Sequence, residues 1–178
     1  MKDELRKKAL SIRKNLPVEQ YSSIIMHKLF SLPEYSKSKN ILSYYPLKSE
    51  VNTLKCFEDT TKNWYLPRVI NETLEFCHYE SSNLKKGSFN IFEPCSSKID
   101  DFSNIDMIII PAVAADKNGY RLGYGKGFYD RFLYSLKSSP VKVILIFHDL
   151  LFETIYPEKH DIKGDIIITN KEIFRIIC

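Results

Sequence analysis

Three nearly continuous apolar runs limit the folds open to this chain of 178 residues more than any other feature. They occupy residues 107–110, 142–147 and 165–169. Short apolar runs without alternation are typical of strands covered on both faces, as in parallel sheets flanked by helices. We therefore predict an α/β fold, a three-layer α/β/α sandwich with a mostly parallel sheet. The length favours a single domain over residues 1–178, large enough to bury a core.

The other elements are predicted from the spacing of apolar residues and from prolines. A second helix is expected to begin at Pro17, which suits a first helical turn, and to end before Pro33. Residues 80–104 combine glycine, proline and several serines, so they are predicted to be mostly loop. The remaining predicted helices cover residues 2–16, 51–59 and 128–136, and the remaining predicted strands cover 41–45, 63–67 and 73–79.

Composition is that of a small soluble enzyme. The net charge of +4 is mild and the lysines are scattered, whereas nucleic-acid binding usually needs a concentrated basic stripe. The charged N-terminus has no apolar run behind it, and the longest apolar stretches, 105–115 and 141–147, are too short to span a bilayer. The four cysteines are far apart and form no C-x-x-C motif, so neither a zinc site nor a disulfide framework is indicated. We expect a cytoplasmic location.

A glycine-rich run is the strongest functional signal. Four of the six glycines lie in residues 119–127, Gly-Tyr-Arg-Leu-Gly-Tyr-Gly-Lys-Gly. Glycine reaches positive φ without steric cost and lets backbone N–H groups approach a ligand closely. With Arg121 and Lys126 adding positive charge, the run predicts a cradle for an oxyanion such as phosphate. A predicted strand precedes it and a predicted helix follows it, an arrangement that often binds nucleotide phosphates.

The run matches neither common nucleotide motif. In a Walker A loop Gly127 would be Ser or Thr, and Tyr120 stands where the first glycine is required. The dinucleotide pattern G-x-G-x-x-G fails because Phe128 occupies its third glycine position. A glycine-rich surface hairpin that binds nothing is the alternative, but such a hairpin requires neither two cations nor the adjacent Asp130.

The run RLGYGKGFYDR, residues 121–131, closely resembles the signature of the 5-formyltetrahydrofolate cyclo-ligase family, also called methenyltetrahydrofolate synthetases. Ala115 departs from the family pattern, which usually has an aromatic there, and Leu151 replaces a frequent glutamine. We expect these two departures to affect local details of the pocket and not the assignment. Further resembling segments fall in the family's order over nearly the whole chain: Lys2-x-x-x-Arg6, Tyr45-Pro46 with Glu50, Leu66-Pro67-Arg68, Gly87 with Glu93-Pro94, and Pro157-x-x-His160-Asp161 followed by Ile168-Thr169.

The resemblance implies a ligase that converts 5-formyltetrahydrofolate to 5,10-methenyltetrahydrofolate, with ATP as co-substrate and Mg²⁺ as cofactor. It implies catalytic roles for Lys126 and Arg121 and magnesium ligation by Asp130 and Asp161. The ATP-binding residues that it implies are Lys2, Arg6, Arg121, Leu122, Gly123, Tyr124, Gly125, Lys126, Gly127, Phe128 and Tyr129. The folate-binding residues that it implies are Tyr45, Glu50, Tyr124 and Tyr129.

Taken without the resemblance, several of these residues have other interpretations. Lys2 and Arg6 share one helix face, and that face could simply be solvated, because Lys7, Lys8 and Arg13 are equally basic. Glu50 could orient a polar heterocycle by accepting its N–H groups, or could be an exposed loop acid. Two distant aspartates that meet at a nucleotide would suffice for Mg²⁺, but Asp130 could instead cap a helix and Asp161 could be a solvated loop carboxylate.

The expected partners are the small molecules ATP and 5-formyltetrahydrofolate, with no nucleic acid and no membrane, and the expected state is a monomer. Two other classes of function remain open at this point. A kinase or phosphotransferase with a different small acceptor would keep the glycine loop without binding folate. A basic nucleic-acid-binding module would use scattered Lys, Arg and aromatic side chains on backbone and bases.

Overall fold

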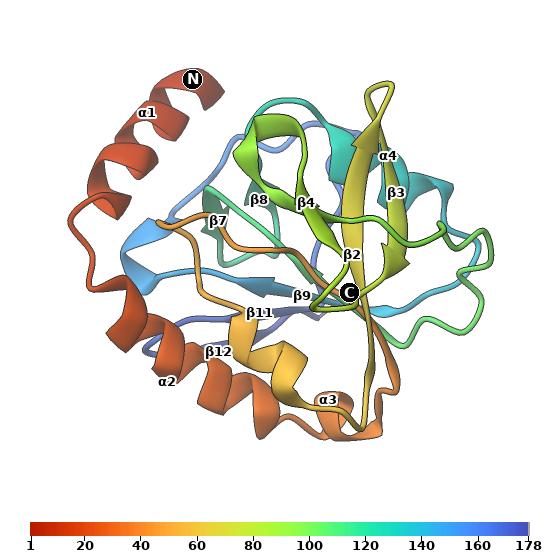
Figure 1. Ribbon diagram of the computed structural model, residues 1–178. Coiled ribbons are helices and arrows are strands. Elements are labelled where there is room, and N and C mark those ends of the chain that lie inside the picture. The colour runs from red at the N-terminus through yellow and green to blue at the C-terminus, as the bar shows by residue number, and fades with distance from the viewer. Residues whose placement is uncertain (178) are drawn as a thin grey trace.

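The computed structural model describes residues 1–177, apart from the side chain of Ser88 (Figure 1). The helices are α1 (Lys2–Arg13), α2 (Val18–Phe30), α3 (Pro33–Lys37) and α4 (Phe128–Ser135), with the 3₁₀ turns η1 (Leu54–Glu58), η2 (Ser88–Asn90) and η3 (His148–Leu150). The strands are β1 (Asn40–Leu42), β2 (Asn63–Ile70), β3 (Thr73–His78), β4 (Leu84–Lys86), β5 (Phe92–Pro94), β6 (Met107–Ile110), β7 (Ala114–Asp116), β8 (Arg121–Leu122), β9 (Val141–Leu145), β10 (Leu151–Phe152), β11 (Ile166–Ile168) and β12 (Ile173–Arg175).

One seven-stranded sheet organises the molecule, in the order β12-β11-β9-β6-β1-β2-β3. The five central strands are parallel, and β3 and β12 pair antiparallel at the two edges. The three apolar runs form β6, β9 and β11, which are neighbours in this sheet. The predicted mostly parallel α/β fold is confirmed.

Helices cover both faces of the sheet. Successive residues of a strand point to opposite sides, so each central strand contributes side chains to two cores. On one face Ile41, Met107 and Ile109 pack in a core with residues of α1 and α2. On the other face Ile108 and Ile110 pack with Phe132 and Leu133, two buried residues of α4. The outcome is the predicted three-layer arrangement.

Several boundaries differ from the prediction. Helix α1 ends at Arg13, and the N–H groups of Asn15 and Leu16 form i→i−3 hydrogen bonds of the 3₁₀ type before Pro17. The helix predicted over 51–59 is only the 3₁₀ turn η1. Strand β2 continues past Pro67 to Ile70, which is possible because β1 pairs only with residues 63–65 and leaves that edge of β2 free beyond them.

The segment 80–104 is mostly loop, as predicted, but it also contains the short antiparallel pair β4–β5, which was missed. A second small sheet, β10-β7-β8, was also missed. These strands have only two or three residues each, too few to produce a recognisable alternation in the sequence.

The glycine-rich run is not one continuous loop. Arg121 and Leu122 form β8, which separates Gly119 from the other three glycines. Gly119 lies in the β7–β8 turn at φ +95°, and a Cβ there would lie 3.0 Å from the carbonyl oxygen of Gly164. Its presence is explained by this turn, so only Gly123, Gly125 and Gly127 belong to the loop that precedes α4.

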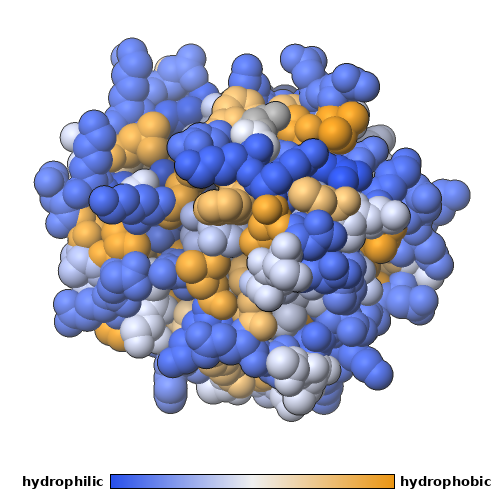
Figure 2. Space-filling model, in the orientation of Figure 1, coloured by the Kyte–Doolittle hydropathy of each residue, from blue (hydrophilic) through white to orange (hydrophobic). Residues whose placement is uncertain are grey.

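The surface shows where apolar side chains remain accessible. Figure 2 shows hydrophobic side chains in the middle of the face seen in Figure 1, bordered by hydrophilic ones.

Among the described residues, no helix has the length and apolar character needed to cross a membrane.

Candidate active site

A cavity of about 290 Å³ lies where β1 and β6 end. Tyr44 and Tyr45 follow β1, and Pro111 follows β6. The β2–β3 hairpin, β5, the glycine loop and the start of α4 supply the other walls. Ligands of open α/β sheets gather outside the carboxyl ends of the strands, and this cavity has that location.

The cavity brings together ten of the fifteen residues that sequence reasoning assigned to the site, and five lie outside its lining. The ten that line it are Tyr45, Glu50, Arg121, Gly123, Tyr124, Lys126, Gly127, Phe128, Tyr129 and Asp130. The five that do not are Lys2, Arg6, Leu122, Gly125 and Asp161.

The glycine loop runs from Gly123 to Gly127 at one end of the cavity. Gly125 has φ +96°, and Gly127, at φ +65°, is the N-cap of α4. A Cβ on Gly123 would meet no atom within 4 Å, so the loop backbone there is open to a ligand. Arg6 reaches the loop from α1, since its Nε donates a 2.8 Å hydrogen bond to the carbonyl oxygen of Gly123. The side chain of Lys126 is exposed beside the same cavity.

Arg121 is buried and holds a carboxylate. Its Nη1 lies 3.0 Å from Oδ1 of Asp130 and also donates to the carbonyl oxygen of Ile162. The Ile162 backbone N–H donates to the same Oδ1, so the β8 strand, α4 and the segment before β11 meet at this carboxylate. No described residue donates a hydrogen bond to Oδ2 of Asp130.

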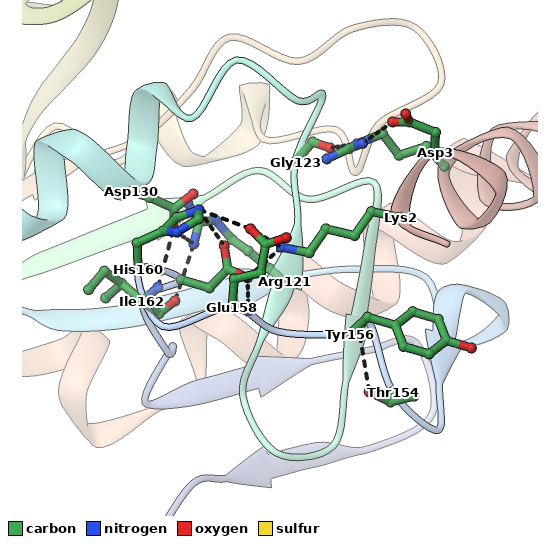
Figure 3. Close-up of polar contacts among 12 residues, drawn as sticks. Lys2, Asp3, Arg121, Gly123, Asp130, Thr154, Tyr156, Glu158, His160 and Ile162 are labelled. Carbon is green, nitrogen blue, oxygen red and sulfur yellow. Dashed lines mark hydrogen bonds and ion pairs between the residues drawn. The ribbon is translucent and has the colours of Figure 1, made fainter.

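Lys2 likewise holds a carboxylate. Lys2 extends from α1 toward Glu158, and Asp130 lies against Arg121 and Ile162 (Figure 3). The Nζ atom of Lys2 lies 2.7 Å from Oδ2 of Asp161. Burial would raise the pKa of Asp161, but hydrogen bonds from Lys2 and from the backbone of Glu158 outweigh it and hold that pKa below its usual range.

Glu50 is a buried carboxylate that faces the cavity. Its Oε2 accepts a hydrogen bond from the Leu47 backbone at 2.8 Å, and its Oε1 accepts one from the Tyr124 hydroxyl at 2.7 Å. Burial raises the pKa of Glu50, and these hydrogen bonds and the charge of Arg13 oppose that rise. Glu50 is therefore not the exposed loop acid that the sequence left open.

Arg13 was missed by sequence reasoning, which grouped it with the solvated lysines of the first helix. Its side chain is buried, and its Nη2 donates a 2.6 Å hydrogen bond to the Tyr124 hydroxyl. The only sequence signal is its position: Arg13 lies four residues after Ala9, the fully buried residue on the inner face of α1.

The walls of the cavity are largely aromatic and aliphatic. Tyr45 and Phe92 pack with their ring centroids 5.1 Å apart, and Tyr129 lies opposite with its hydroxyl buried. Among the described residues that hydroxyl has no hydrogen-bond partner. An apolar cavity with a few polar groups fits a flat heterocycle. Trp64 is buried in the core.

A magnesium ion requires little from the protein, since it usually keeps waters and binds one or two carboxylates plus phosphate oxygens. Within residues 1–177 no cluster of three or more His, Cys, Asp or Glu side chains forms a metal cage. Asp130 still offers a carboxylate oxygen without a hydrogen bond at the edge of the cavity, which fits a hard cation.

The two departures from the family pattern lie opposite each other. Leu151 of β10 is the register partner of Ala115 of β7, and neither lines the large cavity. Ala115 is fully buried, so a small residue on one strand is matched with a larger apolar one on its neighbour.

Comparisons with known proteins agree with this geometry. The model of the 5-formyltetrahydrofolate cyclo-ligase family matches residues 1–170. The chain is 31% identical to the 5-formyltetrahydrofolate cyclo-ligase of Mycoplasma pneumoniae, covering 96% of this chain and 99% of that protein. It is 27% identical to the mouse 5-formyltetrahydrofolate cyclo-ligase, and the match covers 92% of this chain and 87% of the mouse protein.

Solved structures give the same result. The structure of Aquifex aeolicus 5,10-methenyltetrahydrofolate synthetase is similar, with a TM-score of 0.87, 35% identity and coverage of 99% of this chain and 93% of that one. The structure of a 5,10-methenyltetrahydrofolate synthetase from Mycoplasma pneumoniae is similar with a TM-score of 0.77 and 25% identity. The match covers 95% of this chain and 98% of that one. The chain belongs to the 5-formyltetrahydrofolate cyclo-ligase family.

Proposed function

We propose that the protein converts 5-formyltetrahydrofolate to 5,10-methenyltetrahydrofolate, consuming ATP in the presence of Mg²⁺ and releasing ADP and phosphate. The observation that carries this proposal is the lining of the large cavity. The part of the lining formed by the glycine loop, Lys126 and Asp130 is the proposed nucleotide end, and the part formed by Glu50 and the aromatic side chains is the proposed folate end. A flat heterocycle with N–H groups at one end and phosphates at the other is the ligand pair that this lining suits.

The chemistry explains why phosphate binding and folate binding share a cavity. The oxygen of a formamide is a poor leaving group, so transfer of the γ-phosphoryl group to it creates a better one. The N10 amine then attacks the activated carbon, the five-membered ring closes and phosphate departs. Phosphoryl transfer depends mainly on positioning and charge stabilisation, so no protein nucleophile is required.

In this proposal the cationic residues act on the phosphates, and the two aspartates bind the metal ion. Lys126, Arg121 and the loop N–H groups stabilise the migrating phosphoryl charge, while Lys2 and Arg6 bind ATP from α1. Mg²⁺, when bound by Asp130 and Asp161, neutralises phosphate oxygens. The other proposed ATP contacts are Leu122, Gly123, Tyr124, Gly125, Gly127, Phe128 and Tyr129, and the proposed folate contacts are Tyr45, Glu50, Tyr124 and Tyr129.

The glycine loop supports the ATP assignment, since the backbone is open at Gly123 and the guanidinium of Arg6 lies next to Gly125. Leu122 is buried and would contribute through β8, which positions the loop, more than through its side chain. We further propose one domain over residues 1–178, a monomer and a cytoplasmic location.

The test is to mix purified protein, Mg-ATP and 5-formyltetrahydrofolate and to follow the absorbance of methenyltetrahydrofolate. The expected rise requires both ATP and Mg²⁺. Product formed at an undiminished rate without nucleotide would overturn the mechanism. Binding of Mg-ATP without any binding of the folate would favour a phosphotransferase with another acceptor, and thermal shift with each ligand separates the two.

A further inference from the structure

A chain of hydrogen-bonded polar groups, with a buried residue at each end, joins the first helix to the proposed folate end of the cavity. Arg13 Nη2 donates to the Tyr124 hydroxyl at 2.6 Å, and that hydroxyl donates to Glu50 Oε1 at 2.7 Å. The Arg13 carbon Cζ lies 5.6 Å from the centre of the Tyr124 ring. Arg13 and Glu50 are both buried, so a cation and a carboxylate are held in the interior with one hydroxyl between them.

Arg13 does not line the large cavity, and its buried guanidinium is hydrogen-bonded to the Tyr124 hydroxyl. Arg13 and Glu50 instead line a second, small cavity of about 10 Å³, which has room for one water molecule. The Nε and Nη1 atoms of Arg13 are buried and have no hydrogen-bond partner among residues 1–177. A buried guanidinium is costly unless a charge compensates it, and Glu50 is the carboxylate that shares this cavity.

We propose that Arg13 is a positioning residue for folate binding: it fixes the Tyr124 hydroxyl and, through it, the Glu50 carboxylate that receives the N–H groups of the heterocycle. This inference rests on the proposed function, since it assigns a support to the folate end of that site. Tyr124 is suited to the link because its ring lines the large cavity while its hydroxyl lies between Arg13 and Glu50.

Arginine has a specific advantage at this position. Its planar fork can hold the Tyr124 hydroxyl with one nitrogen and still present two N–H directions to the small cavity, whereas lysine has one compact ammonium. Lysine at position 13 would therefore keep the positive charge but would not place its N–H groups in the same directions as the planar guanidinium. Rescue by Arg13→Lys is expected to be partial, and an apolar replacement is expected to do worse.

The test compares Arg13→Met and Arg13→Lys with wild type by calorimetric titration of 5-formyltetrahydrofolate and of Mg-ATP. Removing a charged hydrogen bond that holds a buried partner should weaken folate binding by about ten- to a hundredfold. ATP affinity should change by less than about threefold, since Arg13 holds only the hydroxyl of Tyr124, which is directed at Glu50 on the proposed folate side. Lys7→Met is the matched control, because it removes one charge from an exposed position of the same helix.

The pH dependence of folate binding gives a readout that a merely structural role would not move. The titratable or charged groups that face Glu50 are Arg13 from α1, Tyr44 after β1, Tyr124 from the glycine loop and Tyr129 from α4. Only Arg13 lowers the pKa of Glu50 by its charge. Without it, folate affinity should begin to fall at a higher pH than in wild type as the solution is acidified.

The outcomes separate this inference from the proposed function. Wild type that binds no 5-formyltetrahydrofolate overturns the proposed function, whatever the variants do. Wild type that binds it while Arg13→Met and Arg13→Lys keep equal affinity and the same pH profile overturns only the role of Arg13. Where Arg13→Met does not fold, Tyr124→Phe decides, because it removes the link and keeps Arg13: an unchanged folate affinity in that variant also overturns the inference.

Discussion

The two ends of the large cavity handle charge in opposite ways. At the folate end, Glu50 and Arg13 are buried and joined through the Tyr124 hydroxyl. At the proposed nucleotide end, Arg121 already holds Asp130 at 3.0 Å, and outside the cavity lining Lys2 already holds Asp161 at 2.7 Å. The folate end is organised before its ligand arrives, whereas the nucleotide end has its cations paired with the carboxylates proposed for Mg²⁺.

This difference predicts different consequences for substitutions. A ligand at the folate end meets groups that are already fixed, so losing one of them should appear directly in affinity. At the nucleotide end, each new contact replaces an existing ion pair, so the net gain in binding is small. Lys126 is the exception there: its exposed side chain has no ion-pair partner among residues 1–177.

The largest expected effect is on turnover by Lys126→Ala. A cation that contacts the β- or γ-phosphate matters most as charge moves during transfer, so kcat should fall by about 10²–10³. Protein stability should barely change, because the side chain is exposed. Lys126→Arg should recover only part of the rate, since a planar fork does not occupy the place of a compact ammonium. Steady-state kinetics within about twofold of wild type for the alanine variant would remove Lys126 from the site.

Asp130→Asn tests whether this carboxylate serves a metal or only Arg121. The concentration of Mg²⁺ for half-maximal rate should rise at least about ten- to a hundredfold, the loss usual even for partners outside the metal's own ligands. The free energy of unfolding should also fall by about 1–3 kcal/mol, because the buried Arg121 loses its charged partner. A lower Tm with an unshifted Mg²⁺ titration would make Asp130 purely structural. Asp161→Asn should show the smaller shift in Mg²⁺ requirement.

Glu50→Gln probes the folate end. Amidation replaces an acceptor by a donor facing the N–H groups of the ligand, which costs about 1–3 kcal/mol, or roughly ten- to a hundredfold in folate affinity. ATP affinity should change much less, and equal weakening of both ligands in calorimetry would contradict the placement. Because burial raises the pKa of Glu50, wild-type folate affinity should fall on acidification at a pH above the usual carboxyl range, and the Gln variant should lack this step.

How much of the fold could be predicted depends on whether the signal was local. The runs that form β6, β9 and β11 are apolar because both of their faces are covered, so the sequence alone indicates the sheet. Strands β8 and β10 have two residues each and exist only through their pairing with β7. No local pattern encodes such strands.

The residues of the site also differ in whether a local sequence pattern indicates them. The glycine loop and Glu50 could be proposed from residue type and resemblance to a family. Arg13 could not, because its hydrogen-bond partner Tyr124 lies 111 residues later in the chain. The pairing of Lys2 with Asp161, over 159 residues, was equally invisible in the sequence.

Gly119→Ala and Gly123→Ala separate the fold from the site within one glycine-rich run. Gly119 has φ +95° and a Cβ there would lie 3.0 Å from backbone, so alanine should cost about 1–3 kcal/mol of stability. A Cβ on Gly123 meets nothing within 4 Å, so that variant should keep its Tm and lose affinity only for ATP. Thermal unfolding with and without ATP measures both. An equal loss of Tm in the two variants would mean that both glycines serve the fold.

The smallest effect is expected for Lys2→Met, in spite of the position of Lys2 on the helix face proposed to bind ATP. Lys2 must leave Asp161 and Glu158 to contact a phosphate, so it exchanges one partly exposed ion pair for another. Such pairs contribute about 0–1 kcal/mol, so ATP affinity should fall by roughly fivefold or less. At about 1 M salt the difference from wild type should vanish, because charges are then screened within about 3 Å. Lys7→Met, which removes an exposed charge elsewhere on α1, is the control and should leave affinity unchanged at moderate salt. A loss of ATP affinity that is large and independent of salt would show that Lys2 binds ATP in a dry, preorganised site, and the contrast between the two ends of the cavity would no longer hold.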